Sequence, residues 1–268
     1  MEYQFIETQT EAGIGRIVLN RPEKRNAFND RLVLEIKHAL QTLNEDPACS
    51  LVVFSGRGPA FSAGADLAYL QSLQNNSLQE NLADSRALME LYHQMYGSPK
   101  VLIAQVEGPA LAGGCGLATL CDYCFAVPSA TFGYTEVRIG FIPALVSVFL
   151  VRKIGDARAR ELLLSGDILE AREALRYGLI SFVVEADQIE ETVSSFARNI
   201  AARCAPGSLA ATRKLLAEVQ DLPLTEALEL AALRNAETRS SAECRKGIQA
   251  FLNKEPLNWQ QNLPGSEG

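Results

Sequence analysis

A glycine-lined segment near the middle of the chain contains the residue types needed to hold a negative charge. Residues 111–116 read Leu-Ala-Gly-Gly-Cys-Gly and lie between the apolar run Val101–Val106 and the helix-like stretch 117–120. A turn at the start of a helix presents backbone N–H groups that no side chain shields. Glu136 follows within residues 132–140, where aromatic, glycine and apolar neighbours suit a proton-transferring acid or base. An anion cradle and one carboxylate together predict enolate chemistry.

A second loop of small residues supplies further backbone donors. Residues 61–66 read Phe-Ser-Ala-Gly-Ala-Asp, and small side chains let a backbone approach another group closely. A thioester oxygen that becomes an enolate needs two converging N–H donors, which this loop and residues 111–116 could provide. A simpler alternative is that Gly113 and Gly114 only allow a helix to pack tightly on a strand. Spacing alone leaves both open.

Other catalytic patterns are missing from the sequence. No glycine-rich stretch continues as G-x-G-x-x-G, and neither a G-x-x-x-x-G-K-[ST] loop nor a G-x-S-x-G elbow occurs. His38 and His93 are isolated on helical patterns, which favours packing or surface positions over catalysis. A nucleotide loop and a hydrolase triad are therefore not indicated. Glu136 by itself could also be a solvated loop residue or a partner of Arg138.

The composition describes a large acidic protein. Its 268 residues, 47% of them hydrophobic, can bury a core in one domain or in a domain with an appendage. Asp+Glu 32 against Lys+Arg 25 gives a formal charge of -7, without a basic run, so no nucleic-acid partner is expected. Residues 1–7 lack signal-peptide features and no apolar run approaches membrane-spanning length. We expect a cytoplasmic protein with no membrane partner.

The cysteines predict no metal site. Cys121 and Cys124 form the single C-x-x-C pair among six cysteines, and no second pair or histidine cluster completes a zinc site. Buried free thiols are expected instead, and no metal or redox cofactor is indicated.

The first part of the chain repeats the order strand, small-residue loop, helix. Alternating apolar residues predict a hairpin at its start, and Asn29 can cap the first helix. Residues 67–81, rich in Gln, Asn and Ser, fit a mobile flap better than a core element. The predicted strands are 3–8, 14–19, 51–54, 101–107 and 123–127, and the predicted helices are 29–43, 82–96 and one near Leu117.

The second part of the chain is helical after a last strand-like run at 180–184. This block is expected to pack over the sheet or against a neighbouring subunit, and Pro206-Gly207 could mark a hinge. The predicted helices are 188–202, 208–218, 224–238 and 242–252.

Five motifs, in order along nearly the whole chain, resemble the crotonase, or enoyl-CoA hydratase/isomerase, superfamily. Each motif alone is weak, but the ordered set at the expected spacing is highly specific. The motifs are Asn-Arg-Pro-Glu-Lys-Arg-Asn-Ala at 20–27, Phe-Ser-Ala-Gly-Ala-Asp at 61–66, Leu-Ala-Gly-Gly-Cys-Gly-Leu-Ala at 111–118 with Cys121-Asp122, the segment 132–143, and Ala-Phe-Leu-Asn-Lys at 250–254.

The resemblance implies an α/β fold, a crotonase-type spiral of repeated ββα units over residues 1–200. A C-terminal helical oligomerisation region, residues 201–268, would follow, and the assembly would be a homotrimer or a dimer of trimers. The ligand would be an acyl-CoA thioester, with CoA as part of the substrate and no separate cofactor.

The resemblance also assigns roles to residues. The oxyanion-hole N–H groups would come from Ala65 and Gly113, the latter near a helix amino terminus whose dipole favours negative charge, and Glu136 would be the acid/base. The remaining positions are Lys24, Arg25 and Ala27 near the CoA moiety, Ala63, Asp66 and Leu67 along the adenine and pantetheine, and Phe251 and Lys254, which in relatives often reach the CoA of an adjacent subunit.

One departure from the family pattern bears on the reaction. Hydratases of the best-known type have two glutamates, and this chain has Gly116 where the second, which helps to hold water, would stand. Isomerases that move a double bond often use one carboxylate. The segment Pro143-Ala-Leu-Val-Ser147 is similar to a bacterial branch commonly assigned as methylglutaconyl-CoA hydratase, which often has Gly at the same position.

We therefore expect reversible hydration of a 2-enoyl-CoA, with 3-methylglutaconyl-CoA as a candidate. Glu136 would exchange the proton at the α carbon and handle the water, with assistance from Tyr134 or from a carboxylate on the substrate. The alternatives are an enoyl-CoA isomerase that uses Glu136 alone and a non-catalytic acyl-CoA-binding protein.

Overall fold

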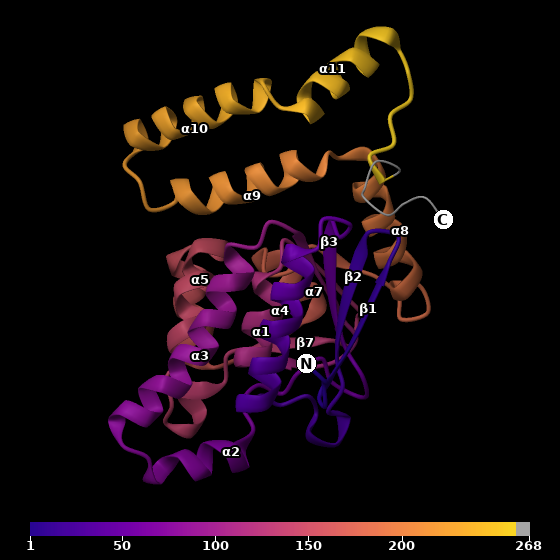
Figure 1. Cartoon of the computed structure of the whole chain (residues 1–268). Coiled ribbons are helices and arrows are strands. Elements are labelled where there is room, and N and C mark those ends of the chain that lie inside the picture. The colour runs from indigo at the N-terminus through magenta and orange to yellow at the C-terminus, as the bar shows by residue number, and fades with distance from the viewer. Residues whose placement is uncertain (261–268) are drawn as a thin grey trace.

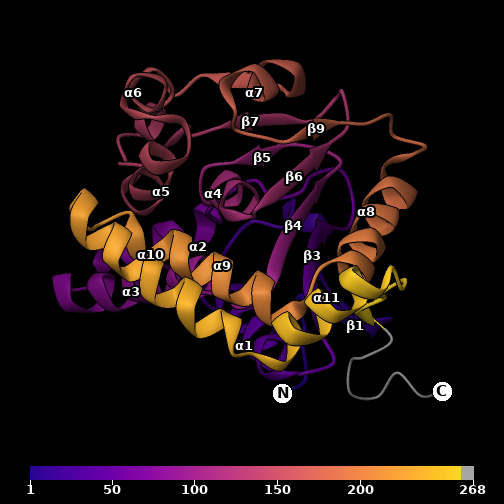
Figure 2. The ribbon, with the colours of Figure 1, turned by 90° about the horizontal axis from the view of Figure 1, so that it is seen from above.

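The computed structural model describes residues 1–260 of the chain. Within this range a six-stranded sheet has the order β1-β2-β3-β4-β6-β9, in which the β1–β2 pair is antiparallel and the other neighbours are parallel. Figure 1 shows β1, β2 and β3, and Figure 2 shows β3, β4, β6 and β9. The strands are β1 (Ile6–Glu11), β2 (Ile14–Leu19), β3 (Leu51–Gly56), β4 (Val101–Val106), β6 (Tyr123–Ala126) and β9 (Phe182–Val183).

A second, three-stranded sheet has the order β5-β7-β8. Its strands are β5 (Ala110–Leu111), β7 (Thr131–Gly133) and β8 (Ile168–Glu170). An isolated parallel bridge joins Ser62 to Ala110, and the Leu111 N–H donates to the Ser62 carbonyl at 2.9 Å. This contact brings the two glycine-rich loops together, as expected, but the sequence did not predict the small sheet beside them.

Strand-strand-helix units recur as β1-β2-α1, β4-β5-α4 and β6-β7-α5, whereas β3, β8 and β9 each lead singly into a helix. In Figures 1 and 2, α4 and α5 lie on one side of the large sheet and α8 lies on the other. The helices are α1 (Asp30–Glu45), α2 (Leu67–Ser72), α3 (Leu78–Tyr96), α4 (Gly113–Leu120), α5 (Ala144–Ile154), α6 (Asp156–Ser165), α7 (Ala171–Tyr177), α8 (Ile189–Arg203), α9 (Pro206–Val219), α10 (Leu224–Arg239) and α11 (Ala242–Asn253), with short 3₁₀ helices η1 (Pro22–Lys24), η2 (Leu73–Asn75) and η3 (Glu136–Ile139).

The amino-terminal hairpin is confirmed, but its first strand begins at Ile6 and not at residue 3. The Gln4 and Phe5 N–H groups donate to the buried Glu35 carboxylate at 2.9 and 2.7 Å, so they are not available to a strand ladder. The predicted cap of α1 is also confirmed, because the Asn29 side chain accepts from the Leu32 N–H at 2.9 Å.

The polar segment 67–81 is helical and, as expected, is not a core element; its mobility stays a prediction. Asp66 caps α2, and Ser77 forms a capping box with Glu80 at the start of α3. These caps satisfy backbone donors that a loop would leave to water. Since α2 has no buried residue, the segment still lies outside the core.

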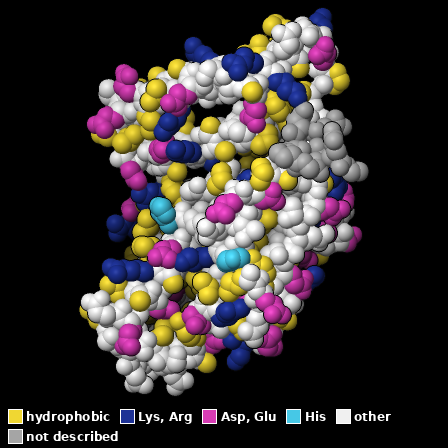
Figure 3. Space-filling model, viewed as in Figure 1, with side chains coloured by type: hydrophobic (Ala, Val, Ile, Leu, Met, Phe, Trp, Pro, Cys, Tyr) yellow, Lys and Arg dark blue, Asp and Glu magenta, His cyan; other side chains and the backbone are white. Residues whose placement is uncertain are grey.

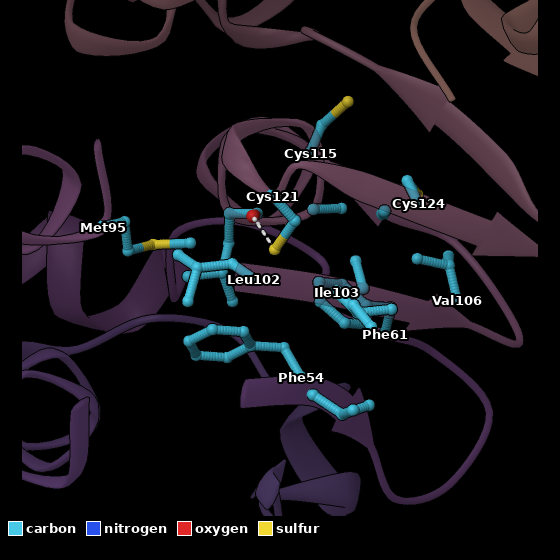
Figure 4. Close-up of a cluster of buried hydrophobic side chains, with 14 of the residues drawn as sticks. Phe54, Phe61, Met95, Leu102, Ile103, Val106, Cys115, Cys121 and Cys124 are labelled. Carbon is cyan, nitrogen blue, oxygen red and sulfur yellow. Dashed lines mark hydrogen bonds between the residues drawn. The ribbon is translucent and has the colours of Figure 1, made fainter. Parts of the chain in front are cut away.

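The core lies between the large sheet and the helices that cover it. Figure 4 shows part of it, with Phe54, Phe61, Leu102 and Cys121 among the buried side chains; the Cys121 Sγ donates to the Leu117 carbonyl at 3.5 Å. Four cysteines are buried free thiols, as predicted, whereas two are only half-buried. The buried ones are Cys49, Cys115, Cys121 and Cys124, and the others are Cys204 and Cys244. Among residues 1–260 no three His, Cys, Asp or Glu side chains gather as a metal ion would require.

The C-terminal helices are confirmed, and α9, α10 and α11 form a layer apart from the sheets (Figures 1 and 2). Arg213 on α9 ties this layer to the core through the Asp122 carboxylate at 2.8 Å and the Ser98 carbonyl. Pro206 and Gly207 form the first turn of α9, where proline is well tolerated. The hinge there stays a prediction.

No helix in the described part of the chain is both long enough and apolar enough to cross a bilayer.

Candidate active site

Segments far apart in the sequence enclose a cavity of about 580 Å³. Most of its wall is apolar, and the polar side chains are concentrated at a few points. The lining residues come from the ranges 24–33, 63–70, 84–92, 112–113 and 135–146.

Close backbone contact brings the two donor loops to the same wall. A Cβ added at Gly64 would lie 2.7 Å from the Ala112 Cβ and 2.9 Å from the Leu111 carbonyl oxygen. A Cβ added at Gly114 would lie 2.5 Å from the Ser62 Cβ. Both glycines are therefore required by packing, and this packing is also what places the donors side by side.

The Ala65 N–H is held by the residues on either side of it. The Phe28 N–H donates to the Gly64 carbonyl at 2.6 Å, and the Asp66 N–H donates to the Phe28 carbonyl at 2.8 Å. In a parallel bridge of this pattern the intervening Ala65 N–H points away from Phe28. Ala65 lines the cavity, and its N–H has no acceptor within the described residues.

The Gly113 N–H is the first donor of α4, where a helix has no internal acceptor. The preceding residue, Ala112, has φ 48° and ψ -123°, a backbone conformation that strains any residue except glycine. The Ala112 N–H donates to the Gly133 carbonyl at 2.7 Å, which helps to maintain the conformation. The strain is thus located where it sets the direction of a donor at the cavity wall.

Glu136 lines the same cavity from the start of η3. Its Oε2 atom is buried and has no hydrogen-bond partner within the described residues. Burial raises the pKa of this carboxyl, because desolvation penalises the charged form. Arg138 is not its partner, since that side chain pairs with Asp167 at 3.2 Å.

A buried amide builds the loop that carries Lys24 and Ala27. Asn26 has φ 54° and is fully buried. Its side chain accepts from the Arg21 N–H at 2.8 Å and donates to the Arg57 and Ala60 carbonyls at 3.0 and 2.9 Å. These bonds hold the loop so that Lys24 and Ala27 line the cavity.

Asp66 lines the cavity, but its carboxylate is engaged in the structure. It caps α2 through the Ala68 N–H at 3.0 Å and pairs with Arg21 at 2.8 Å. Burial alone would raise the pKa of this carboxyl, but the Arg21 guanidinium and the backbone donors outweigh burial and lower it. Asp66 therefore acts on the shape of the site through the loop that it fixes.

The structure separates two tyrosines that the sequence could not rank. Tyr134 is fully buried with its hydroxyl 3.0 Å from the Thr119 hydroxyl, and it does not line the cavity, so the assistance expected from it is not supported. Tyr92, which the sequence gave no reason to choose, lines the cavity and donates to the Gly113 carbonyl at 2.8 Å.

The position of the family's second glutamate is filled by other side chains. A Cβ added at Gly116 would lie 2.5 Å from the Val146 Cγ1 and 3.0 Å from the Tyr92 hydroxyl. The chain therefore has no room there for a larger side chain without rearrangement.

Most of the predicted site residues meet at one cavity, and three do not. Those that line it are Glu136, Ala65, Gly113, Lys24, Ala27, Ala63, Asp66 and Leu67. Arg25 is exposed beside it, while Phe251 and Lys254 lie at the end of α11, at the opposite end of the molecule from α2 in Figure 1.

Sequence reasoning missed the apolar wall and one polar pair. The apolar lining residues give no local signal of function, because apolar side chains are normally interpreted as packing residues; examples are Phe28, Phe141 and Val146. The Tyr69 hydroxyl, also in the wall, donates to Asp84 at 2.6 Å and links α2 to α3.

A smaller cavity, of about 320 Å³, lies over β1, β2 and β3 and contains none of these residues. Its charged side chains pair with one another, as in Arg16–Glu190 and Arg57–Glu7, both at 2.8 Å.

Comparison with known proteins points to the same kind of chemistry as the geometry of the cavity. A family model described as Enoyl-CoA hydratase/isomerase matches residues 9–262. The chain belongs to this family.

Relatives of the enoyl-CoA hydratase/isomerase family match over almost the full length. A Thermus thermophilus protein named "Putative enoyl-CoA hydratase" is 43% identical over 249 residues, 92% of this chain and 98% of that protein. Crotonyl-CoA hydratase of Syntrophomonas wolfei is 33% identical over 263 residues, covering 97% and 99%. The solved structure of Pseudomonas aeruginosa AtuE has a TM-score of 0.92 at 34% identity, covering 96% of this chain and 100% of that chain. The predicted crotonase-type α/β fold is confirmed, and the chain is an enzyme of this family.

Proposed function

We propose that the protein catalyses the reversible addition of water across the double bond of a 2-enoyl-CoA thioester. One observation carries the proposal: the unpartnered, buried carboxylate oxygen of Glu136 belongs to the same cavity as the Ala65 and Gly113 N–H groups, which have no acceptor in the described chain. A proton-transferring group and two anion donors around one cavity fit enolate chemistry.

Glu136 would carry the proton through both halves of the reaction. Its carboxylate takes a proton from water as the water oxygen bonds to the β carbon, and the π electrons move onto the thioester oxygen. The protonated Glu136 then returns a proton to the α carbon as the thioester carbonyl re-forms. A raised pKa suits this role, because the group must be able to accept a proton and also to release it.

The Ala65 and Gly113 N–H groups would bind the thioester oxygen while it carries charge. Removing one such donor commonly costs about 3 kcal/mol of transition-state stabilisation. The amino terminus of α4 adds favourable dipole potential at Gly113.

The identity of the acyl group is a separate part of the proposal. Crotonyl-CoA hydratase of Syntrophomonas wolfei, by its name, acts on a short uncharged chain, and aliphatic residues such as Leu88, Leu145 and Val146 make the wall suitable for an apolar chain. 3-Methylglutaconyl-CoA stays a prediction. Its free carboxylate would need donors, and Ser85 and Lys24 are donors in the same wall, whereas the Tyr69 hydroxyl already donates to Asp84.

CoA would be held by Lys24, Arg25, Ala27, Ala63, Asp66 and Leu67 of one chain, with Phe251 and Lys254 reaching the CoA of a neighbouring subunit.

We propose residues 201–268 as the region through which a trimer or a dimer of trimers forms. Exposed apolar side chains on α9, α10 and α11 support this, for example Leu224 at 76% and Phe251 at 83% exposure (Figure 3). Residues 261–268 of this region lie outside the described residues.

Six free cysteines fit a reducing compartment such as the cytoplasm.

A second candidate, isomerisation of a 3-enoyl-CoA by Glu136 alone, is favoured by the packing at Gly116. Val146 and Tyr92 occupy the place where the second carboxylate would help to hold water. An isomerase needs no such water, because one carboxylate can take a proton from one carbon and return it to another.

Incubation with crotonyl-CoA and 3-methylglutaconyl-CoA in oxygen-18 water, followed by mass spectrometry, tests the proposal. The wild type should incorporate label, and Glu136→Gln should lose most of the rate, by about 10²–10⁴-fold. Full hydration by Glu136→Gln would refute the mechanism. If neither substrate gains label, proton exchange on a 3-enoyl-CoA would indicate the isomerase, and binding without any turnover would indicate an acyl-CoA-binding protein.

A further inference from the structure

Tyr92 reaches from α3 to the first turn of α4, in the wall of the cavity. Its side chain is fully buried, and its hydroxyl donates to the Gly113 carbonyl at 2.8 Å. Phe149 packs edge-on against its ring with centroids 6.2 Å apart. The phenol is therefore held by packing, and it directly holds the residue whose N–H was placed in the oxyanion hole.

Two glycines make the space that the hydroxyl occupies. Gly113 and Gly116 lie three residues apart on α4 and so share one face of the helix. A Cβ added at Gly113 would lie 3.1 Å from the Tyr92 hydroxyl oxygen, and one added at Gly116 would lie 3.0 Å from it. We call this space between Gly113 and Gly116 the notch. Val146 also bounds it, because its Cγ1 would lie 2.5 Å from a Cβ added at Gly116. The glycine at 116 is thus required by the phenol and Val146 together.

Gly113 is the kind of residue that needs such a restraint. Glycine has wide backbone freedom, and the first residue of a helix has no internal N–H bond to hold it. The peptide that carries the Gly113 N–H is anchored at its carbonyl, because the Ala112 oxygen accepts from the Gly116 N–H at 3.0 Å. The Tyr92 hydroxyl fixes the peptide that follows. The donor N–H thus lies between two anchored groups.

Burial keeps this phenol in its neutral, donating form. Desolvation raises the pKa of Tyr92 far above its usual range, and the negative charge of Glu136 raises it further. Tyr92 therefore does not replace the missing carboxylate as an acid or base.

Resting on the proposed function, we propose that Tyr92 is a positioning residue of this enzyme, whose hydroxyl aims the Gly113 N–H at the thioester oxygen. The notch between Gly113 and Gly116 is the seat of that hydroxyl. Gly116, which stands where the second carboxylate would be, leaves room for the Tyr92 hydroxyl. Gly116 thereby contributes indirectly to the oxyanion hole.

Tyr92→Phe removes the hydroxyl and leaves the ring, and Tyr134→Phe is the matched control. Tyr134 is also fully buried with one bonded hydroxyl, but it does not line the cavity. With crotonyl-CoA, Tyr92→Phe should lower kcat by about tenfold and leave KM within about twofold. This is less than the roughly 10²–10³-fold loss on removing a donor outright. Tyr134→Phe should leave kcat within about twofold. Equal kcat values for the two variants would overturn the proposal.

A spectroscopic readout separates positioning from a merely structural effect. Polarisation of a conjugated 2,4-dienoyl-CoA by the two N–H donors shifts its absorption to longer wavelength on binding, with no turnover required. Tyr92→Phe should reduce this shift at saturation, whereas Tyr134→Phe should preserve it; an unchanged shift in Tyr92→Phe would overturn the proposal. If the wild type shifts the probe but hydrates nothing, the proposed reaction fails while the role of Tyr92 is still tested.

Gly116→Ala provides a second variant should Tyr92→Phe fail to fold. The added Cβ would press on the hydroxyl while the phenol remains, so the shift and kcat should both decrease. Preservation of both would contradict the inference.

Discussion

Filling the notch at Gly116 is the most direct test of why this chain has one carboxylate where the family resemblance leads us to expect two. Gly116→Ala and Gly116→Glu both place a Cβ 2.5 Å from the Val146 Cγ1. Ordinary carbon contacts are about 3.5–4.0 Å, so the two groups must separate by about 1 Å or more. Both residues are buried, Val146 with 5% exposure, so relief of the clash requires Val146 to shift within the cavity wall.

Overpacking of this kind typically costs about 1–3 kcal/mol. Alanine recovers up to about 1 kcal/mol through its better helix propensity, so Gly116→Ala should be mildly destabilising. Gly116→Glu should be worse, because its longer side chain must also pass the Tyr92 hydroxyl. For a chain of this size each 1 kcal/mol lowers Tm by about 2–4 °C. We therefore expect Gly116→Glu to lower Tm by roughly 2–12 °C and not to increase hydration.

A double-mutant cycle with Val146→Ala isolates the contact. Val146→Ala alone should destabilise by leaving a cavity, but in the Gly116→Ala background the space is used. Thermal and urea unfolding of the four proteins should give a favourable coupling energy of about 1 kcal/mol or more. Additivity within about 0.5 kcal/mol would show that Val146 does not close the notch, and the account of Gly116 would then be wrong.

Three other perturbations have defined outcomes. The raised pKa of Glu136 means that its contribution to stability is present below the ordinary value of 4.5 and is lost as pH rises through the raised value. Glu136→Gln should therefore gain stability relative to wild type from pH 4 to pH 8 in urea unfolding, and a constant difference would contradict this. The pKa of Asp66 is lowered, so its contribution to stability is present above the ordinary value of 3.8 and is lost as pH falls through the lowered value. Asp66→Asn should therefore be less stable than wild type at neutral pH, through loss of the Arg21 pair, and this deficit should shrink as pH falls below 3.8. A deficit independent of pH would contradict this. Leu228→Glu with Phe251→Glu, at 61% and 83% exposed positions, should dissociate the proposed trimer in sedimentation experiments, and a monomeric wild type at micromolar concentration would refute the assembly.

Local sequence features predicted much of the fold, because each rests on interactions among near neighbours. The Asn29 cap and the apolar face of α1 need only residues a few positions apart. The C-terminal helices were placed within about two residues of their ends by periodicity. Segment 67–81 was the exception, because its polar composition concealed two caps, at Asp66 and Ser77, that start helices.

The second sheet escaped prediction for a different reason. Its strands β5, β7 and β8 are two or three residues long, too short to show an alternating pattern. What defines them is pairing between distant segments, such as Leu111 with Gly133 and Gly133 with Ile168.

The sequence by itself determined the chemistry that this chain can offer: one carboxylate at Glu136, small-residue loops with unshielded N–H groups, and an ordered set of motifs. Motif order along the chain also selected site residues of which most line the cavity.

Only the tertiary structure decided which groups meet. It places Ala65 beside the start of α4 and leaves the Glu136 oxygen without a partner. It also places Tyr92, and not Tyr134, in hydrogen-bond contact with Gly113. It also filled the space at Gly116. The physical reason is that these contacts join segments tens of residues apart, and their distances are set by packing across the sheets, which no local pattern of residues encodes.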